Sequence, residues 1–261
     1  MSPSGSEPES LAEGTLISHL LELRTRLLHT VVAVAIVFVP LAFMSNRLFT
    51  LVAQPLIDKL PEGTSIIATS VVAPFMTPLK LSLIAAIFVA MPYILYQAWA
   101  FVAPGLYRHE KRFALPLFVS SVVLFYGGVA FAYYVVFPLM FSFLTATAPS
   151  GVRMMTDMAN YLDFTLLLFF AFGIAFEMPV ATVLLVATGL VKVESLRKHR
   201  GYVLLGIFVV AAFLTPPDAI SQTFMAVPMY ILYELGIVLS QLLTRRRAAD
   251  RAAADATQSS D

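Results

Sequence analysis

The chain has 261 residues, of which 59% are hydrophobic and only 13% charged, with a mean hydropathy of +0.84 and a net charge of +1. Soluble domains carry about 25% charged residues, so the composition excludes an ordinary soluble protein and indicates an integral membrane protein. Cysteine is absent, which excludes disulfides and thiolate chemistry, and the four histidines lack metal-ligand spacing. We therefore expect no metal site, no cofactor and no nucleic-acid partner.

Taken in chain order, the sequence begins with a polar stretch that lacks the basic start and early apolar run of a cleaved secretory signal. Residues 1–26 are predicted to form a tail with an amphipathic helix, and residues 243–261 a disordered tail. Between them the pattern predicts an all-α membrane protein with six transmembrane helices, several kinked by proline, that form a curved, concave wall. The predicted spans are residues 27–44, 79–102, 113–137, 161–187, 201–214 and 223–242.

The fifth predicted span is short, since about 14 residues give about 21 Å against a core of roughly 30 Å. The connection 45–78 is too long for a tight turn, and its apolar stretches indicate short helices or extended pieces lying over the membrane. We found no convincing internal repeat.

Lysine and arginine set the expected orientation. With six spans, thirteen of the 17 basic residues fall on the side that holds both termini, and four fall on the other side. Because basic residues concentrate in cytoplasmic loops, both termini are predicted to be cytoplasmic.

One ionisable residue, Glu177, lies inside the apolar stretch 164–191 and is followed by Met178 and Pro179. On a helix that starts at Tyr161 it lies about 24 Å along the axis, far from the membrane surface at that end. Carboxylates in such positions are costly and usually functional or paired. Two interpretations stay open: a protonated glutamate bonded to a neighbouring helix, or a polar point inside a membrane cavity.

Two further segments carry acidic residues near the predicted cytoplasmic surface. Residues 18–27 are typical of an amphipathic helix, in which Glu22 and Arg26 are spaced for an intrahelical ion pair. Residues 93–112 combine an aromatic rim, which includes Phe101, with a sharp turn and Glu110 among basic residues. Each acid is either a simple salt-bridge partner or part of a binding site.

On the other side, Thr215, Pro216, Pro217 and Asp218 connect the last two spans. Asp218 is suited to cap the sixth helix, and Gln222 to hydrogen-bond a partner helix.

Enzyme signatures are missing. The sequence holds no nucleophile elbow, zinc-protease motif or phosphate-binding loop, and Asp163 and Glu177 are too far apart for an intramembrane protease dyad. We expect no catalytic residues. A proton-coupled small-solute transporter with Glu177 as proton carrier remains a rival hypothesis, although such a protein would be expected to show an internal repeat.

Six stretches, in this order, resemble the TatC family, the core subunit of the twin-arginine protein translocase. They are HLLELRTRL (19–27), PYILYQAWAFVAPGLYRHEKR (92–112), FYGGVAFAYYVVFPL (125–139), FGIAFEMPV (172–180), SLRKHRGY (195–202) and TPPDAISQTFMAVPMYILYE (215–234). The resemblance covers about residues 16–240 and includes the six spans and inside termini.

The resemblance implies a function in the bacterial cytoplasmic membrane. TatC-like proteins recognise signal peptides with two consecutive arginines and, with TatA- and TatB-type single-span partners in a multimeric complex, export folded proteins by means of the proton-motive force. It further implies the following roles: Glu22, Glu110 and Phe101 bind the signal, Arg24 positions that site, Glu177 lies near the signal's apolar region, and partner helices contact Thr215, Pro216, Pro217, Asp218 and Gln222.

Overall fold

The computed structural model describes residues 7–57, 66–102, 111–146, 155–215 and 219–258, and these residues are almost entirely helical. The elements in chain order are α1 (Glu7–Phe43), α2 (Ser45–Ile57), α3 (Ala73–Val102), α4 (Lys111–Phe131), η2 (Ala132–Val136), α5 (Phe137–Ala146), α6 (Met158–Phe176), α7 (Met178–Ala187), α8 (Val193–Lys198), α9 (Arg200–Leu214) and α10 (Ala219–Gln258). The predicted all-α fold class is confirmed.

Within the described residues, five helical stretches are long and apolar enough to cross a membrane by length and composition, namely Leu20–Phe43, Ala73–Phe101, Leu115–Phe143, Met158–Ala187 and Ala219–Arg245. The apolar helix α9 has 15 residues and is shorter, as the sequence predicted. Each of the six predicted spans therefore corresponds to an apolar helix, and α2 is a short helix within the predicted long connection.

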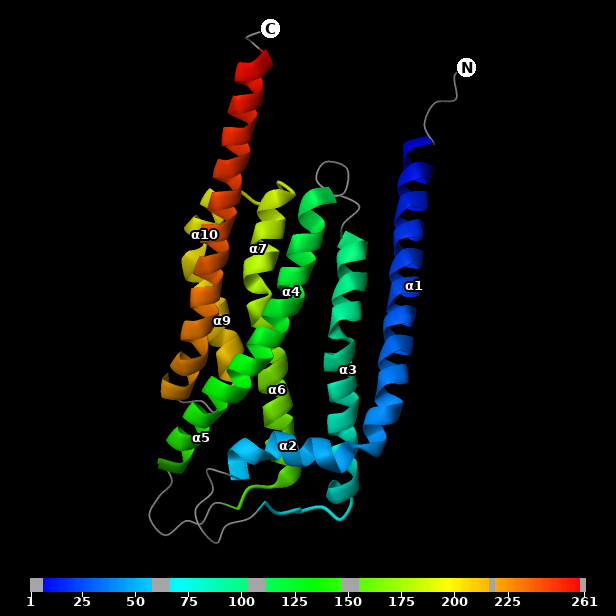
Figure 1. Cartoon of the computed structure of the whole chain (residues 1–261), viewed down its shortest axis with the longest axis vertical. Helices are drawn as coiled ribbons and strands as arrows, with labels where there is room; N and C mark the ends of the chain where they lie inside the picture. Colours follow the sequence, from blue (N-terminus) through cyan, green and yellow to red (C-terminus); the bar gives the residue numbers. More distant parts are fainter. Residues whose placement is uncertain (1–6, 58–65, 103–110, 147–154, 216–218, 259–261) are drawn as a thin grey trace.

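Figure 1 shows how these helices are arranged. α1 lies beside α3, α4 crosses in front of α6 and α7, and α9 and α10 lie at the opposite edge from α1. The first turns of α1 and the last turns of α10 lie at the same end of the bundle, which we call the terminal end. α2 lies across the other end, which we call the α2 end. An even number of crossings places both tails on one side in this way.

α2 is fastened to the bundle by two tyrosine hydroxyls. Tyr133 donates to the carbonyl of Leu51 at 3.1 Å, and Tyr161 donates to the carbonyl of Val52 at 2.9 Å. The Leu51 carbonyl needs such a donor because the residue four positions later, Pro55, has no N–H. The two bonds hold α2 over the ends of the spans.

The core lies between α4, η2, α5, α6, α9 and α10, and aromatic side chains fill much of it. Phe125, Phe137 and Phe172 are fully buried. Glycines let the helices approach: a Cβ on Gly128 would lie 2.4 Å from the carbonyl oxygen of Phe172, and one on Gly173 would lie 2.6 Å from the ring of Phe125. Close helix packing at small residues is the usual source of stability where lipid removes the hydrophobic driving force.

The prolines within the predicted spans differ in whether they interrupt their helix. Pro179 lies at a break, just after α6 ends and α7 begins. Pro40, Pro92, Pro116 and Pro228 lie within continuous helices. Near Pro138 the chain forms the π-helical turn η2, where the N–H of Phe137 bonds the carbonyl of Ala132, five residues earlier. π turns commonly occur as single bulges inside long helices.

Residues 18–27, predicted to be helical, form part of α1, which runs unbroken from Glu7 into the first span. The C-terminal tail differs from the expectation. α10 continues to Gln258, through most of the tail expected to be disordered. The tail is rich in alanine and arginine, which have high helix propensity, and this outweighs the lack of an apolar face.

Candidate functional site

The first polar group lies at the terminal end, on α1. Arg26 donates from Nε and Nη2 to the same oxygen of Glu22, Oε1, at 3.0 and 2.6 Å. Both side chains are partly buried, with 24% of Arg26 and 38% of Glu22 exposed. The intrahelical ion pair that the spacing allowed is therefore present, and it leaves Oε2 of Glu22 without a protein partner among the described residues.

The pair is fastened to α3 by a residue that the sequence reasoning missed. Nη1 of Arg26 donates to Oε1 of Gln97 at 3.1 Å, and the amide nitrogen of Gln97 donates to the hydroxyl of Tyr93 at 2.7 Å. Gln97 is buried. A buried amide inside an apolar span is costly unless it is paired, and this could have marked Gln97 as a partner of a charged residue.

The remaining residues predicted for this end have different positions. Phe101 lies one turn beyond Gln97 in the last turn of α3 and is half-buried, whereas Arg24 lies on α1 and is exposed. Glu110 lies outside the described residues. We call the group formed by Glu22, Arg26, Gln97 and Phe101 the α1–α3 rim.

The second polar group lies inside the bundle at Glu177, in the break between α6 and α7. The hydroxyl of Ser121 on α4 donates to Oε2 of Glu177, while Oε1 is buried without a partner. Glu177 thus bonds a neighbouring helix and also lines a hollow of about 240 Å³, and the two interpretations of its role stay open. Trp99, two residues before Phe101, lines the same hollow, which therefore extends from the last turns of α3 to the glutamate.

The predicted partner-contact residues lie at the α2 end of α9 and α10. The hydroxyl of Thr215 bonds the carbonyl of Ala211 in its own helix, and the amide of Gln222 donates to the carbonyl of Phe208 at 2.8 Å. Gln222 thus ties α10 to α9 within the chain. Pro216, Pro217 and Asp218 lie outside the described residues.

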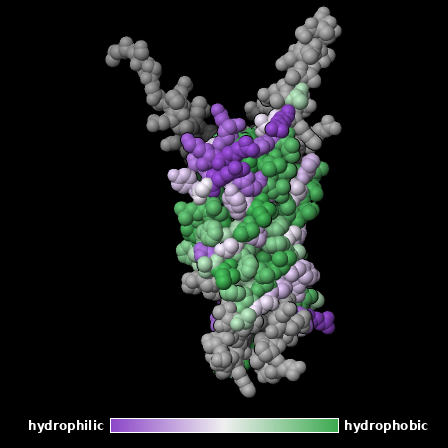
Figure 2. Space-filling view, turned by 90° about the vertical axis from the view of Figure 1, so that its left-hand side faces the viewer, coloured by the Kyte–Doolittle hydropathy of each residue, from purple (hydrophilic) through white to green (hydrophobic). Residues whose placement is uncertain are grey.

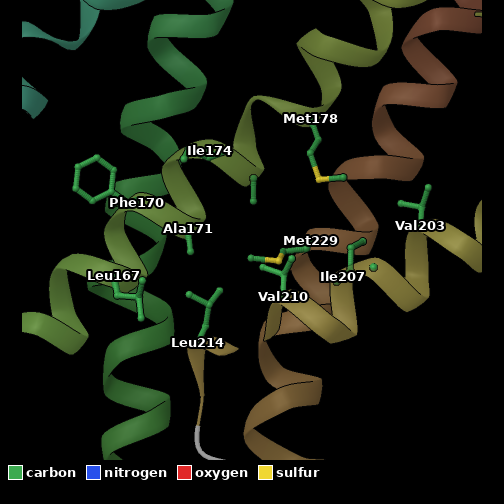
Figure 3. A pocket seen from close by; sticks show the side chains of 12 residues that line it. Leu167, Phe170, Ala171, Ile174, Met178, Val203, Ile207, Val210, Leu214 and Met229 are labelled. Carbon is green, nitrogen blue, oxygen red and sulfur yellow. The ribbon is translucent and has the colours of Figure 1, made fainter. Parts of the chain in front are cut away.

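A larger hollow, of about 600 Å³, lies between α6, α7, α9 and α10. Its lining is apolar, and Figure 3 shows the side chains of Met178, Met229 and Leu214 around the shared space. Flexible methionine side chains are common where a surface accommodates variable partners. Among the described residues, no group of three His, Cys, Asp or Glu side chains is placed to hold a metal ion.

A bundle whose described residues include five helical stretches long and apolar enough to cross a membrane defines a multi-pass membrane protein. Residues 18–228 match the family described as TatC: Sec-independent protein translocase protein (TatC). The chain belongs to this family of protein-translocase components.

Relatives agree closely with this assignment. The Sec-independent protein translocase protein TatC of Azotobacter chroococcum mcd 1 is 53% identical over 241 residues, which cover 92% of this chain and 94% of that protein. The protein of the same name from Escherichia coli (strain K12) is 54% identical over 226 residues, which cover 87% and 88%. A crystal structure of a "Twin Arginine Translocase Receptor- TatC" superposes with a TM-score of 0.78 at 37% identity and covers 87% of this chain and 99% of that one. The resemblance inferred from the six stretches is confirmed.

Proposed function

We propose that the protein is the receptor for twin-arginine signal peptides and the scaffold of a translocase that exports folded proteins. The observation that carries the proposal is the α1–α3 rim, in which one carboxylate oxygen of Glu22 is held by Arg26 and the other is left for a ligand. Two adjacent arginines of a signal are always charged and favour carboxylates through forked hydrogen bonds. The crystal structure that this chain resembles is described as a twin-arginine translocase receptor, which supports the same role.

The signal is proposed to bind in two parts. The arginines of the signal contact Glu22 and Glu110, beside Phe101. Arg26 and Gln97 hold the Glu22 carboxylate in place. Arg24 helps to position the site and does not contact the signal. The apolar part of the signal then follows the hollow that Trp99 shares with Glu177. At about 240 Å³ the hollow has room for a few apolar side chains of the signal, and its lining is mainly apolar.

Partner helices are proposed to dock on the α9–α10 side. TatA- and TatB-type single-span proteins would contact the turn from Thr215 to Asp218 and Gln222, next to the apolar hollow of about 600 Å³. The short α9 cannot cover a full membrane thickness, so a neighbouring helix would shield the remainder. Several copies of the chain would assemble in one complex.

The setting of the proposal is the bacterial cytoplasmic membrane, with both termini in the cytoplasm and transport driven by the proton-motive force. The orientation rests on the sequence, in which thirteen basic residues fall on the predicted side of both termini and four on the other.

Site-specific photocrosslinking tests the receptor role. A photoreactive residue at position 101 is expected to crosslink a twin-arginine signal, and Glu22→Gln or Glu110→Gln is expected to weaken that capture by about tenfold, because a hydrogen bond to a charged group contributes about 1.5–3 kcal/mol. Glu194→Gln removes an acidic side chain from α8 instead and serves as the control. Equal crosslinking in the double variant of Glu22 and Glu110 would overturn the proposal.

Copurification of the single-span partners tests the docking role. Gln222→Leu is expected to reduce their recovery while signal capture is retained. Thr223→Val is the control, since the Thr223 hydroxyl bonds only the carbonyl of Ala219 in its own helix. Full recovery of the partners with Gln222→Leu would contradict this part.

The rival function is a proton-coupled small-solute transporter with Glu177 as carrier. The buried, unpartnered Oε1 in a hollow is the observation that favours it. Liposomes that contain only this protein separate the two: proton-coupled solute flux without partners would support the transporter, and its absence together with signal capture would support the receptor.

A further inference from the structure

A third hollow, of about 360 Å³, lies under the short helix α8 at the terminal end, and neither the signal nor the partner proposal uses it. Leu185 of α7, Leu196 of α8, Val203 of α9 and Tyr233 of α10 contribute to its apolar walls. Its volume is at the lower end of ordinary small-molecule sites. It is too narrow for a helix, whose diameter with side chains is about 10–12 Å, and its walls offer little to water.

The edge of this hollow is polar. Ser195 and His199 of the α8 segment line it, and Nδ1 of His199 lies 2.7 Å from the carbonyl oxygen of Ser195. A carbonyl only accepts hydrogen bonds, so Nδ1 carries the hydrogen in this contact. The other ring nitrogen, Nε2, has no protein partner among the described residues and is available to a ligand.

Cations surround this edge. The segment from Lys192 to Arg200 carries four lysines and arginines and a single acid, Glu194. Two of the cations are held in place: Arg197 hydrogen-bonds the side-chain amide of Gln241, and Arg200 forms an ion pair with Glu234 at 2.5 Å. The other two, Lys192 and Lys198, are exposed.

The charge and the hollow coincide at one level of the molecule. Figure 2 shows hydrophilic side chains gathered near the terminal end of the face that carries α10, directly above a band of hydrophobic ones. A phospholipid has its polar and apolar regions in the same vertical order, with a charged headgroup above an apolar acyl chain. Basic pockets between membrane helices bind anionic headgroups for this reason.

We propose that the hollow under α8 binds one anionic phospholipid. An acyl chain fills the apolar space against Leu185, Leu196 and Val203, and the phosphate lies at the edge formed by Ser195 and His199, where Lys192 and Lys198 supply positive charge. A zwitterionic lipid would fill the same space without the net attraction to the cations, so the site discriminates by headgroup charge.

Tryptophan quenching by brominated lipids tests the site directly. The chain has one tryptophan, Trp99, so Trp99→Phe gives a silent background and Leu185→Trp places the reporter at the hollow. In vesicles of mixed composition, a brominated phosphatidylglycerol is expected to quench this reporter at about 25-fold lower mole fraction than a brominated phosphatidylcholine. Lys192→Gln with Lys198→Gln is expected to remove most of that preference, at about fivefold for each charge.

Two controls separate a site from general attraction to a basic surface. Val119→Trp places the reporter at an exposed position of α4, two turns after Lys111 and Arg112, that lines none of the three hollows described above, and little headgroup preference is expected there. Arg47→Gln with Arg245→Gln removes two cations elsewhere and should leave the Leu185→Trp result unchanged. Native mass spectrometry of the unaltered protein provides a second measurement, in which retained phosphatidylglycerol is expected.

Equal quenching by the two lipids at Leu185→Trp would overturn the proposal. So would a preference that survives the loss of both lysines, or an equal preference at Val119→Trp. Signal capture is measured separately on protein that keeps Trp99, with and without Lys192→Gln and Lys198→Gln, so a failure here leaves the receptor proposal intact.

Discussion

Arg26 on α1 and Gln97 on α3 are joined by a hydrogen bond of 3.1 Å, although they lie 71 residues apart in the sequence. The bond connects two helices whose other contacts are largely apolar, and it does so beside the carboxylate of Glu22. It therefore fixes the position of the proposed signal-binding carboxylate relative to the aromatic end of α3.

The first prediction follows from this bond. Gln97→Leu removes the acceptor for Arg26 and is expected to weaken signal capture by about tenfold, since hydrogen bonds to charged groups are worth about 1.5–3 kcal/mol. Gln97→Glu keeps an acceptor and is expected to retain capture. The measurement is crosslinking of a twin-arginine signal at fixed protein concentration, and unchanged capture by Gln97→Leu would show that the rim does not depend on α3.

The second prediction concerns the contact of α4 with α6. Gly128→Ala would place a Cβ 2.4 Å from a backbone oxygen, which cannot move aside as a side chain can, so a loss of about 1–3 kcal/mol in the free energy of unfolding is expected. Gly127→Ala is a matched control on the same helix, because its Cβ would meet the nearest atom of Phe176 at an ordinary 3.9 Å. Thermal unfolding in detergent compares the two, and equal midpoints would contradict the packing described.

The third prediction concerns the environment of Glu177. Ser121→Ala removes the donor to Oε2 and is expected to lower stability by about 1 kcal/mol. Ser120→Ala is the neighbouring control, because the Ser120 hydroxyl bonds only the carbonyl of Leu117 in its own helix. If both variants unfold at the same temperature as the unaltered protein, the bond to Glu177 contributes nothing to stability.

The fourth prediction is a pH dependence at the α2 end. The hydroxyl of Thr69, followed by the backbone N–H groups of Asn160 and Thr69, lowers the pKa of Asp157 from 3.8 to about 2. Because the folded value lies below the unfolded one, the carboxylate stabilises the folded state above about pH 4, and this contribution is lost as the pH falls through about 2. These bonds join the segment around Thr69 to the first turn of α6.

Asp157→Ala measures that contribution. The difference in unfolding temperature between this variant and the unaltered protein is expected to be present at about pH 6 and to shrink toward about pH 2. Asp163→Ala controls for the general loss of a carboxylate. Asp163 lies in α6, the helix that Asp157 caps, and it pairs with Lys80 of α3. A difference that is constant over the whole range would exclude the proposed cause.

Much of the fold could be predicted because membrane spans have a simple physical requirement. Twenty or so apolar residues satisfy their backbone within one helix, so the spans around Leu27, Leu79 and Thr223 were evident from sequence alone. The intramembrane position of Glu177 followed from the same pattern.

The partners of polar residues could not be predicted in the same way, because each depends on how two helices rotate against one another. The bond of Arg26 to Gln97 and that of Ser121 to Glu177 are set by packing, and no spacing along the chain encodes them. The helical C-terminal tail was also not foreseen, since its polar composition indicated disorder while its alanines favour helix.

The π turn at Ala132–Val136 has a consequence for how the third span tolerates changes in length. Such a turn accommodates one residue more than an α-helix of equal rise, so a deletion within it would restore regular geometry locally. Side chains beyond that point would keep their direction, because the wider turn already absorbs the extra residue. Phe137 and Met140 would then stay enclosed, whereas a deletion in the regular helix before the π turn would rotate them by about 100° toward other neighbours, so this stretch is expected to accept the removal of a residue only inside the π turn.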